Sequence, residues 1–284
     1  MRKWLLALAL TLPWPAAAAC PDQARVARLA QEILERRPSQ GYGPGMSLAD
    51  ALCARDRLVA HLAQPYGDVV GWKVGLTNPA AQQRFGVPHP LAGAIFHGTL
   101  RARSGAELPA AFGAAPAIEA DLLVRVRDEG INTAGDDPVA ILRHIDQVIP
   151  FIEMPDLVFA PGVAMDGPGL LAINVGARLG VVGEPIEAQA TPDFARRLSA
   201  MTVVLAHDQR ELSRTPGSIL MGHPLNVIPW LVRDLASQDR RLRAGEYVSL
   251  GGFSPALPTE AGRTYTLTYE GLQDAPVRVT VRLH

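Results

Sequence analysis

From about residue 69 to the C-terminus, short apolar runs alternate with turn residues, and this alternation restricts the possible folds most. Glycine (26) and proline (24) are plentiful among the 284 residues, which favours short strands and many turns over a helical bundle. The pattern predicts an α+β fold dominated by mixed or antiparallel sheet. The expected strands are residues 69–76, 93–96, 118–126, 172–182, 201–207, 247–250, 265–269 and 277–283.

Helical periodicity is confined to four stretches. Residues 22–37 carry apolar side chains at helical spacing, and Ser47 is a candidate N-cap for a second helix through Leu62. These two helices predict an N-terminal helical hairpin over residues 20–66, followed by one domain over residues 67–284. Further helices are expected at residues 139–148 and 224–235.

The first 19 residues are typical of a secretory signal. Arg2 and Lys3 precede an apolar stretch over residues 4–12, and residues 16–19 are the small residues that a signal peptidase requires. The stretch is too short to span a membrane, so no stable membrane insertion is expected after cleavage. We therefore expect a periplasmic or secreted protein; the alternative is a mis-assigned start or an apolar N-terminal helix in a cytoplasmic protein.

The two cysteines, Cys20 and Cys53, are relevant to the same question. In an oxidising compartment they could form a disulfide that joins the start of the mature chain to the second helix. Cys20 could instead be lipidated, but a lipoprotein signal prefers leucine three residues earlier, where this chain has Ala17. The disulfide is the favoured interpretation. The formal net charge of −1 gives no indication of nucleic-acid binding.

Three carboxylates in the middle of the chain indicate a metal site. Glu119 and Asp121 are two residues apart in a predicted strand and should project from the same face, while Glu153 lies within an apolar run. A buried carboxylate without a partner is costly, and a hard cation such as Mg²⁺ or Mn²⁺ would stabilise all three. The alternative for the first two is an ordinary half-exposed strand.

Other residues could take part in binding or catalysis. Lys73 lies between Gly71 and Gly75 on a predicted strand, and the glycines permit close approach of a ligand, although a surface lysine would show the same pattern. His223 precedes a predicted helix and could cap it or contact substrate. Asn174 could contact an anion or belong to a turn.

These motifs together resemble one enzyme family. In order, they are residues 71–77 (GWKVGLT), Glu119-x-Asp121, Glu153 after an apolar run, and residues 222–226 (GHPLN) followed by Trp230-Leu231. The set resembles the 2-keto-4-pentenoate hydratase / 4-oxalocrotonate decarboxylase branch of the fumarylacetoacetate hydrolase superfamily. The resemblance covers about residues 22–284.

The resemblance implies a fold and a site. The fold is a fumarylacetoacetate hydrolase C-terminal-like mixed β-sandwich roll with an N-terminal helical segment, usually in a homo-oligomer. The metal ligands would be Glu119, Asp121 and Glu153 around Mg²⁺ or Mn²⁺, and Lys73 would be the active-site lysine. Asn174 and His223 are the candidate substrate-binding residues.

One departure from the family affects the expected reaction. Family hydratases carry an acid in a Pro-Asp-aromatic-Gly segment, where this chain has Leu91 and Ala92, and a further acidic pair beyond it is also missing. His97 could substitute as the acid/base group, because its ordinary pKa is near neutrality. We expect a hydratase-like lyase of aromatic catabolism acting on a small 2-oxo acid or its dienol. The alternatives are a decarboxylase or C–C hydrolase, or an exported 2-oxo-acid-binding protein without turnover.

Overall fold

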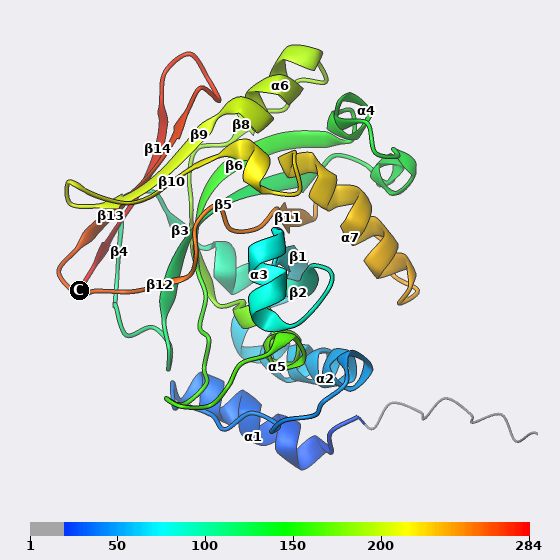
Figure 1. Cartoon of the computed structure of the whole chain (residues 1–284), viewed down its shortest axis with the longest axis vertical. Helices are drawn as coiled ribbons and strands as arrows, with labels where there is room; N and C mark the ends of the chain where they lie inside the picture. Colours follow the sequence, from blue (N-terminus) through cyan, green and yellow to red (C-terminus); the bar gives the residue numbers. More distant parts are fainter. Residues whose placement is uncertain (1–19) are drawn as a thin grey trace, which may run out of the picture.

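A computed structural model describes residues 20–284, so the predicted signal over residues 1–19 lies outside the described residues. Two mixed sheets and a group of helices make up this part of the chain (Figure 1). Within residues 20–284, no helix has the length and apolar character needed to cross a membrane. The predicted α+β class and the predominance of sheet are confirmed.

The larger sheet has nine strands, in the order β2-β1-β11-β5-β6-β7-β3, with β12 paired to β5 and β8 paired to β6. Most neighbours are antiparallel; β1 with β11 and β3 with β7 are parallel. The strands are β1 (Val69–Gly75), β2 (Leu91–Phe96), β3 (Ala102–Arg103), β5 (Ala117–Val126), β6 (Ile145–Met154), β7 (Leu179–Val182), β8 (Ile186–Glu187), β11 (Tyr247–Ser249) and β12 (Leu257–Pro258).

The smaller sheet packs against the middle of the larger one. Its five strands run in the order β10-β9-β13-β14-β4. Tyr269 on β13 joins the two sheets, because its buried hydroxyl donates to the carbonyl of Asp121 and accepts the amide of Phe151 at 3.1 Å. The strands are β4 (Ala106–Leu108), β9 (Thr202–His207), β10 (Arg210–Pro216), β13 (Thr264–Glu270) and β14 (Val277–Leu283).

The N-terminal helices α1 (Gln23–Leu34) and α2 (Leu48–Tyr66) lie with α5 (Gly167–Ala172) at one end of the molecule (Figure 1). Ser47 and Asp50 form a reciprocal capping box at the start of α2. The predicted disulfide is present: Cys20 is bonded to Cys53 on α2, and their Cα atoms are 5.5 Å apart. This bond ties the start of the described chain to the helical layer.

The remaining helices surround the sheets. Residues 224–235 were expected to be helical, and they form the 3₁₀ turn η5 (Pro224–Asn226) and α7. The sequence patterns missed α3 and α6. The helices that surround the sheets are α3 (Pro79–Phe85), α4 (Pro138–Leu142), α6 (Pro192–Ala200) and α7 (Val227–Ala236). The 3₁₀ turns are η1 (His97–Leu100), η2 (Glu129–Thr133), η3 (Asn174–Gly176) and η4 (Gly217–Ile219).

Two predicted elements were wrong. Residues 139–148 were expected to be a helix, but α4 ends at Leu142 and residues 145–154 form β6, where tertiary pairing with β5 outweighs the local periodicity. Residues 172–182 were expected to be a strand, but only residues 179–182 are extended. Asn174 and Val175 have φ values of 58° and 52°, which place them in the left-handed region and break any strand there.

Candidate active site

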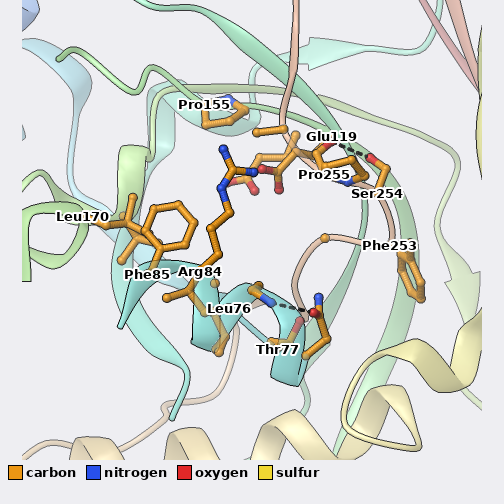
Figure 2. A pocket seen from close by; sticks show the side chains of 18 of the residues that line it. Leu76, Thr77, Arg84, Phe85, Glu119, Pro155, Leu170, Phe253, Ser254 and Pro255 are labelled. Atoms are coloured by element: carbon orange, nitrogen blue, oxygen red, sulfur yellow. Dashed lines mark hydrogen bonds between the residues drawn. The ribbon is translucent and has the colours of Figure 1, made fainter. Parts of the chain in front are cut away.

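A cavity of about 440 Å³ opens between β1, α3, β5, β6 and the loop that follows β11 (Figure 2). Its charged lining comes from Lys73 on β1, Arg84 on α3, Glu119 on β5 and Glu153 on β6. Thr77, Thr215 and Ser254 contribute hydroxyl groups. Most of the remaining wall is apolar and includes Leu76, Phe85, Leu157, Met165, Leu170, Ile219 and Phe253. The volume suits a small organic acid.

Strand register brings two of the predicted carboxylates together. Glu119 on β5 is directly opposite Glu153 on β6 in the antiparallel ladder, so their side chains emerge from neighbouring positions on one face. Asp121 is two residues further along β5 and projects from the same face as Glu119. The three carboxylates therefore belong to one face of the β5–β6 pair.

Asp121 is the deepest of the three and does not line the cavity. Its side chain is fully buried. Its Oδ2 accepts the Ser249 hydroxyl at 2.6 Å, and its Oδ1 accepts the amides of Leu122 at 2.5 Å and Gly251 at 3.2 Å. These bonds fix the carboxylate below the cavity floor and connect β5 with the segment at the end of β11.

Lys73 and Glu153 form a buried ion pair at the bottom of the cavity. The Nζ of Lys73 also donates to the carbonyl of Val175 at 2.9 Å. Burial opposes the charge of the ammonium, but Glu153, Glu119 and Asp121 outweigh that effect and raise the pKa of Lys73. Lys73 is therefore a stable cation in this environment.

The carboxylates around Lys73 carry more negative charge than its single ammonium can balance. Burial, together with the charge of Glu153, raises the pKa of Glu119 to about 7 and raises the pKa of Asp121 well above its ordinary value. One ammonium cannot balance three carboxylates at such short range. A divalent cation at this place would supply the missing positive charge.

The donor set can be compared with what such a cation requires. Mg²⁺ and Mn²⁺ bind carboxylate oxygens, and three carboxylates project from this face. As the side chains stand, no group of three or more His, Cys, Asp and Glu residues within residues 20–284 is arranged to hold a metal ion. The donor chemistry and the excess of negative charge fit a hard divalent cation. One carboxylate oxygen of Glu153 is engaged by the ion pair with Lys73.

The other predicted site residues lie away from the cavity lining. His97 is an exposed residue at the start of η1, where its side chain lies next to Gly67. Asn174 is buried and holds β2: its Oδ1 accepts the amide of Ala94 at 2.7 Å, and its Nδ2 donates to the carbonyl of the same residue at 2.9 Å.

His223 has the geometry of a helix cap. Its Nδ1 accepts the amide of Leu225 at 3.1 Å, and its Nε2 donates to the carbonyl of Ala195 at 2.9 Å. Burial lowers the pKa of His223. Leu91 and Ala92, which replace the family's acidic segment, are buried residues of β2 outside the cavity lining.

The cavity's second cation, Arg84 on α3, was not predicted from the sequence. Figure 2 shows its side chain extending into the cavity toward the side where Glu119 lies. The helix itself had a recognisable pattern, because Asn78 caps it, Pro79 occupies its first turn and Gly86 ends it in the left-handed conformation. The direction of the Arg84 side chain depends on tertiary packing and had no such pattern.

Comparison with known proteins gives both relatives and a shared fold. No family model matches the chain. A 2-keto-4-pentenoate hydratase of Burkholderia vietnamiensis is 32% identical over 215 residues, covering 72% of this chain and 75% of that protein. Another, from Paraburkholderia phymatum, is 30% identical over 269 residues, covering 88% and 96%. The solved structure of 4-oxalocrotonate decarboxylase from Pseudomonas putida G7, complexed with magnesium and adipate, superposes with a TM-score of 0.81 at 23% identity, covering 92% and 97%.

Proposed function

Because this chain belongs to the 2-keto-4-pentenoate hydratase / 4-oxalocrotonate decarboxylase branch of the fumarylacetoacetate hydrolase superfamily, we propose that it is a divalent-metal-dependent lyase. Its substrate would be a small 2-oxo acid or the corresponding dienol. The observation that carries this proposal is the meeting of Lys73, Glu119 and Glu153 in one cavity of suitable size. A role in aromatic catabolism is part of the same proposal.

We assign the cation to Glu119, Asp121 and Glu153. A bound Mg²⁺ or Mn²⁺ would supply Lewis-acid stabilisation of the negative charge that develops on a 2-oxo acid. Support comes from the donor chemistry and from the raised pKa values of Glu119 and Asp121, which are caused by burial and then by the charge of Glu153. The structural neighbour was solved with magnesium.

Lys73 would act on the substrate as a cation. Its raised pKa keeps the ammonium protonated at neutral pH, so Lys73 can hold an anionic oxygen or donate a proton, and it cannot serve as a free base. The carbonyl of Val175 and the carboxylate of Glu153 fix the position of Nζ. The apolar wall around Leu157 and Leu170 limits the access of bulk water to the charged groups.

Within this family we propose hydration as the first reaction to test, because the two curated relatives described above are 2-keto-4-pentenoate hydratases. Decarboxylation is the second candidate. It is supported by the structural similarity to 4-oxalocrotonate decarboxylase from Pseudomonas putida G7. The absence of the acidic segment at Leu91 and Ala92 supports the alternative of a binding protein without turnover. Both reactions begin with a 2-oxo acid and develop enolate charge.

The reaction can be tested with two substrates. The purified mature protein is incubated with Mg²⁺ and either 2-hydroxypenta-2,4-dienoate or 4-oxalocrotonate, and dienol absorbance and carbon dioxide release are followed. Metal-dependent loss of the dienol without carbon dioxide indicates a hydratase, and metal-dependent release of carbon dioxide indicates a decarboxylase. A suitable control is Glu187→Gln, because Glu187 is exposed on β8 outside the cavity. Binding of oxalate without turnover of either substrate would instead favour the binding-protein alternative.

We also propose export and self-association. The Cys20–Cys53 disulfide suits an oxidising compartment, in agreement with the signal expected over residues 1–19. Mass spectrometry of the mature N-terminus tests the export proposal, since a protein that retains Met1 contradicts it. Light scattering of the purified protein tests the homo-oligomer.

A further inference from the structure

We infer that Asn174 is a positioning residue for Lys73. Its side chain holds the turn η3 in place, and the carbonyl of the next residue, Val175, accepts the ammonium of Lys73 at 2.9 Å. Asn174 itself lies outside the cavity lining. This role rests on the proposed function, because it concerns how the cation of the lyase is directed at its substrate.

The Asn174 side chain pairs with both backbone groups of one residue of β2. Its Oδ1 accepts the amide of Ala94 and its Nδ2 donates to the carbonyl of Ala94, while Asn174 is only 1% exposed. A Cβ atom at the preceding residue, Gly93, would lie 2.5 Å from the Asn174 carbonyl oxygen, so the turn packs directly on the strand backbone. Gly93 is opposite Lys73 in the ladder between β2 and β1. The side chain of Asn174 therefore fixes η3 to the strand beside Lys73.

The turn that carries the accepting carbonyl has an unfavourable backbone. The φ values of Asn174, Val175 and Gly176 are 58°, 52° and 68°. Asparagine and glycine tolerate this left-handed region, whereas a β-branched residue rarely enters it. The Val175 side chain is buried against Gly75 of β1, where an added Cβ atom would lie 2.8 Å from its Cγ1. Contacts with β2 and β1 on the two sides of the turn therefore maintain a conformation that Val175 alone disfavours.

The Val175 carbonyl determines the direction of the ammonium. An ammonium has three N–H donors. Within residues 20–284, those of Lys73 have two partners, the carbonyl of Val175 and the carboxylate of Glu153. These two partners leave the third donor for the cavity that Lys73 lines. Without the carbonyl, the ammonium keeps its pairing with Glu153 but loses its fixed direction, so substrate binding should change little while an orientation-dependent reaction slows.

The mobility of the Lys73 ammonium tests this role without turnover, because Lys73 is the single lysine of residues 20–284. The mature protein is labelled with ¹⁵N-lysine, and relaxation of the Nζ signal is measured at one pH. Asn174→Gly removes the side chain and keeps a residue that accepts a positive φ. Asn132→Ala is the matched control, since Asn132 also bonds both backbone groups of one residue, Leu242, outside the cavity lining.

In Asn174→Gly the Nζ order parameter should fall by at least about a third, from the rigid toward the flexible range. With 2-hydroxypenta-2,4-dienoate or 4-oxalocrotonate, whichever the parent turns over, kcat should fall at least about tenfold while KM changes less than about threefold. Asn132→Ala should lose stability and keep the Nζ mobility and kcat of the parent. A result in which Asn132→Ala loosens Nζ as much as Asn174→Gly would overturn the role, because a general loss of stability would then explain both.

Gly93→Ala is a second variant that keeps both Asn174 and Lys73. Its added methyl group displaces the turn from β2, so it should also loosen Nζ. Parent-like Nζ mobility in Asn174→Gly would overturn the positioning role. If Asn174→Gly does not fold, Gly93→Ala decides the question, and parent-like Nζ mobility in that variant would overturn the role.

Failure of the proposed function gives a different result from failure of the positioning role. A parent that turns over no 2-oxo acid, together with a loosened Nζ in Asn174→Gly, contradicts the lyase and leaves the positioning of Lys73 standing. Metal-dependent turnover by the parent, with Nζ mobility and kcat unchanged in Asn174→Gly, contradicts the positioning role and leaves the lyase standing.

Discussion

The ammonium of Lys73 and the carboxylate of Glu153 form an ion pair across the larger sheet, with each residue 4% exposed. Lys73 is on β1 and Glu153 is on β6, and the strands β11 and β5 lie between them in the sheet order. The sequence has lysine only at positions 3 and 73, so Lys73 is the single lysine of residues 20–284. This allows its ionisation to be followed without interference from other lysines.

The first prediction concerns the charge of Lys73. In protein labelled with ¹⁵N-lysine, the Nζ signal of the mature chain should remain that of a charged ammonium up to at least pH 10.5, because its three carboxylate neighbours raise its pKa above that ordinary value. Glu153→Gln removes the largest of the favourable charges, so the pKa should fall. A neutral Lys73 amine at pH 8 in the parent would contradict this account.

The second prediction concerns the stability of Lys73→Met. Removing one partner of a buried ion pair leaves an uncompensated charge, which costs about 3–5 kcal/mol of unfolding free energy. Urea unfolding in EDTA measures the loss. Added Mg²⁺ should restore part of it, since a cation bound by the carboxylates stabilises the folded state. An equal loss of unfolding free energy with and without Mg²⁺ would show that the carboxylates around Lys73 do not bind the metal.

The third prediction concerns Glu119→Gln without metal. The folded-state pKa of Glu119 is raised to about 7 from an ordinary 4.5, so the folded protein holds this proton longer than the unfolded chain does. The contribution of Glu119 to stability is therefore complete below pH 4.5 and is lost as the pH rises through 7.

Glutamine does not titrate, so Glu119→Gln should be more stable than the parent above pH 7 and equal to it below pH 4.5. Since Glu119 partly faces the open cavity, we expect a gain on the order of 1–2 kcal/mol. Denaturant unfolding in EDTA at several pH values measures it. A glutamine variant less stable than the parent at pH 8 would contradict the raised pKa of Glu119.

The fourth prediction separates a structural role of Asn174 from substrate binding. Asn174→Ala removes both hydrogen bonds to Ala94 and leaves buried backbone groups unpaired, which should cost about 2–4 kcal/mol. If its role is structural, adipate affinity under conditions where the variant is folded should stay within about threefold of the parent. Unchanged stability with a large loss of affinity would instead assign Asn174 to the substrate.

The fifth prediction concerns the disulfide. Cys20 and Cys53 are 33 residues apart, and a loop of this length corresponds to about 3–4 kcal/mol of stabilisation. Dithiothreitol should lower the unfolding free energy of the parent by that order. A Cys20→Ser/Cys53→Ser variant serves as the control, because its stability should not respond to the reductant. An insensitive parent would show that the bond is absent or energetically neutral.

Local sequence patterns predicted those parts of the fold that depend on neighbouring residues. The strand around Glu119, the helix after Pro224 and the capping role of Ser47 all follow from spacing and side-chain chemistry. Residues 145–148 were mistaken for helix because their extended conformation depends on the pairing of β6 with β5 and β8. Asn174 and Val175 were mistaken for strand because their left-handed backbone is imposed by the contact of Asn174 with β2.

In the candidate site, too, local sequence patterns predicted some features, whereas others depended on tertiary structure. The i, i+2 rule placed Glu119 and Asp121 on one face, but it could not place Glu153 opposite Glu119, since strand register is a tertiary property. Resemblance to a family supplied that association. His97 was selected because it lies where the family's acidic pair is missing, and His223 because it belongs to the motif of residues 222–226 before a predicted helix. Their positions on η1 and before η5 depend on turns that bring neither into the cavity lining.

The claim that Glu119, Asp121 and Glu153 hold a divalent cation is tested most directly by titrating the protein with Mn²⁺ and following the free ion by electron paramagnetic resonance. The parent and Glu187→Gln should bind about one ion per chain with the same affinity. Glu119→Gln and Glu153→Gln should each bind at least about tenfold more weakly, the equivalent of one lost ligand. Parent-like Mn²⁺ affinity in both cavity variants would contradict the proposed metal site.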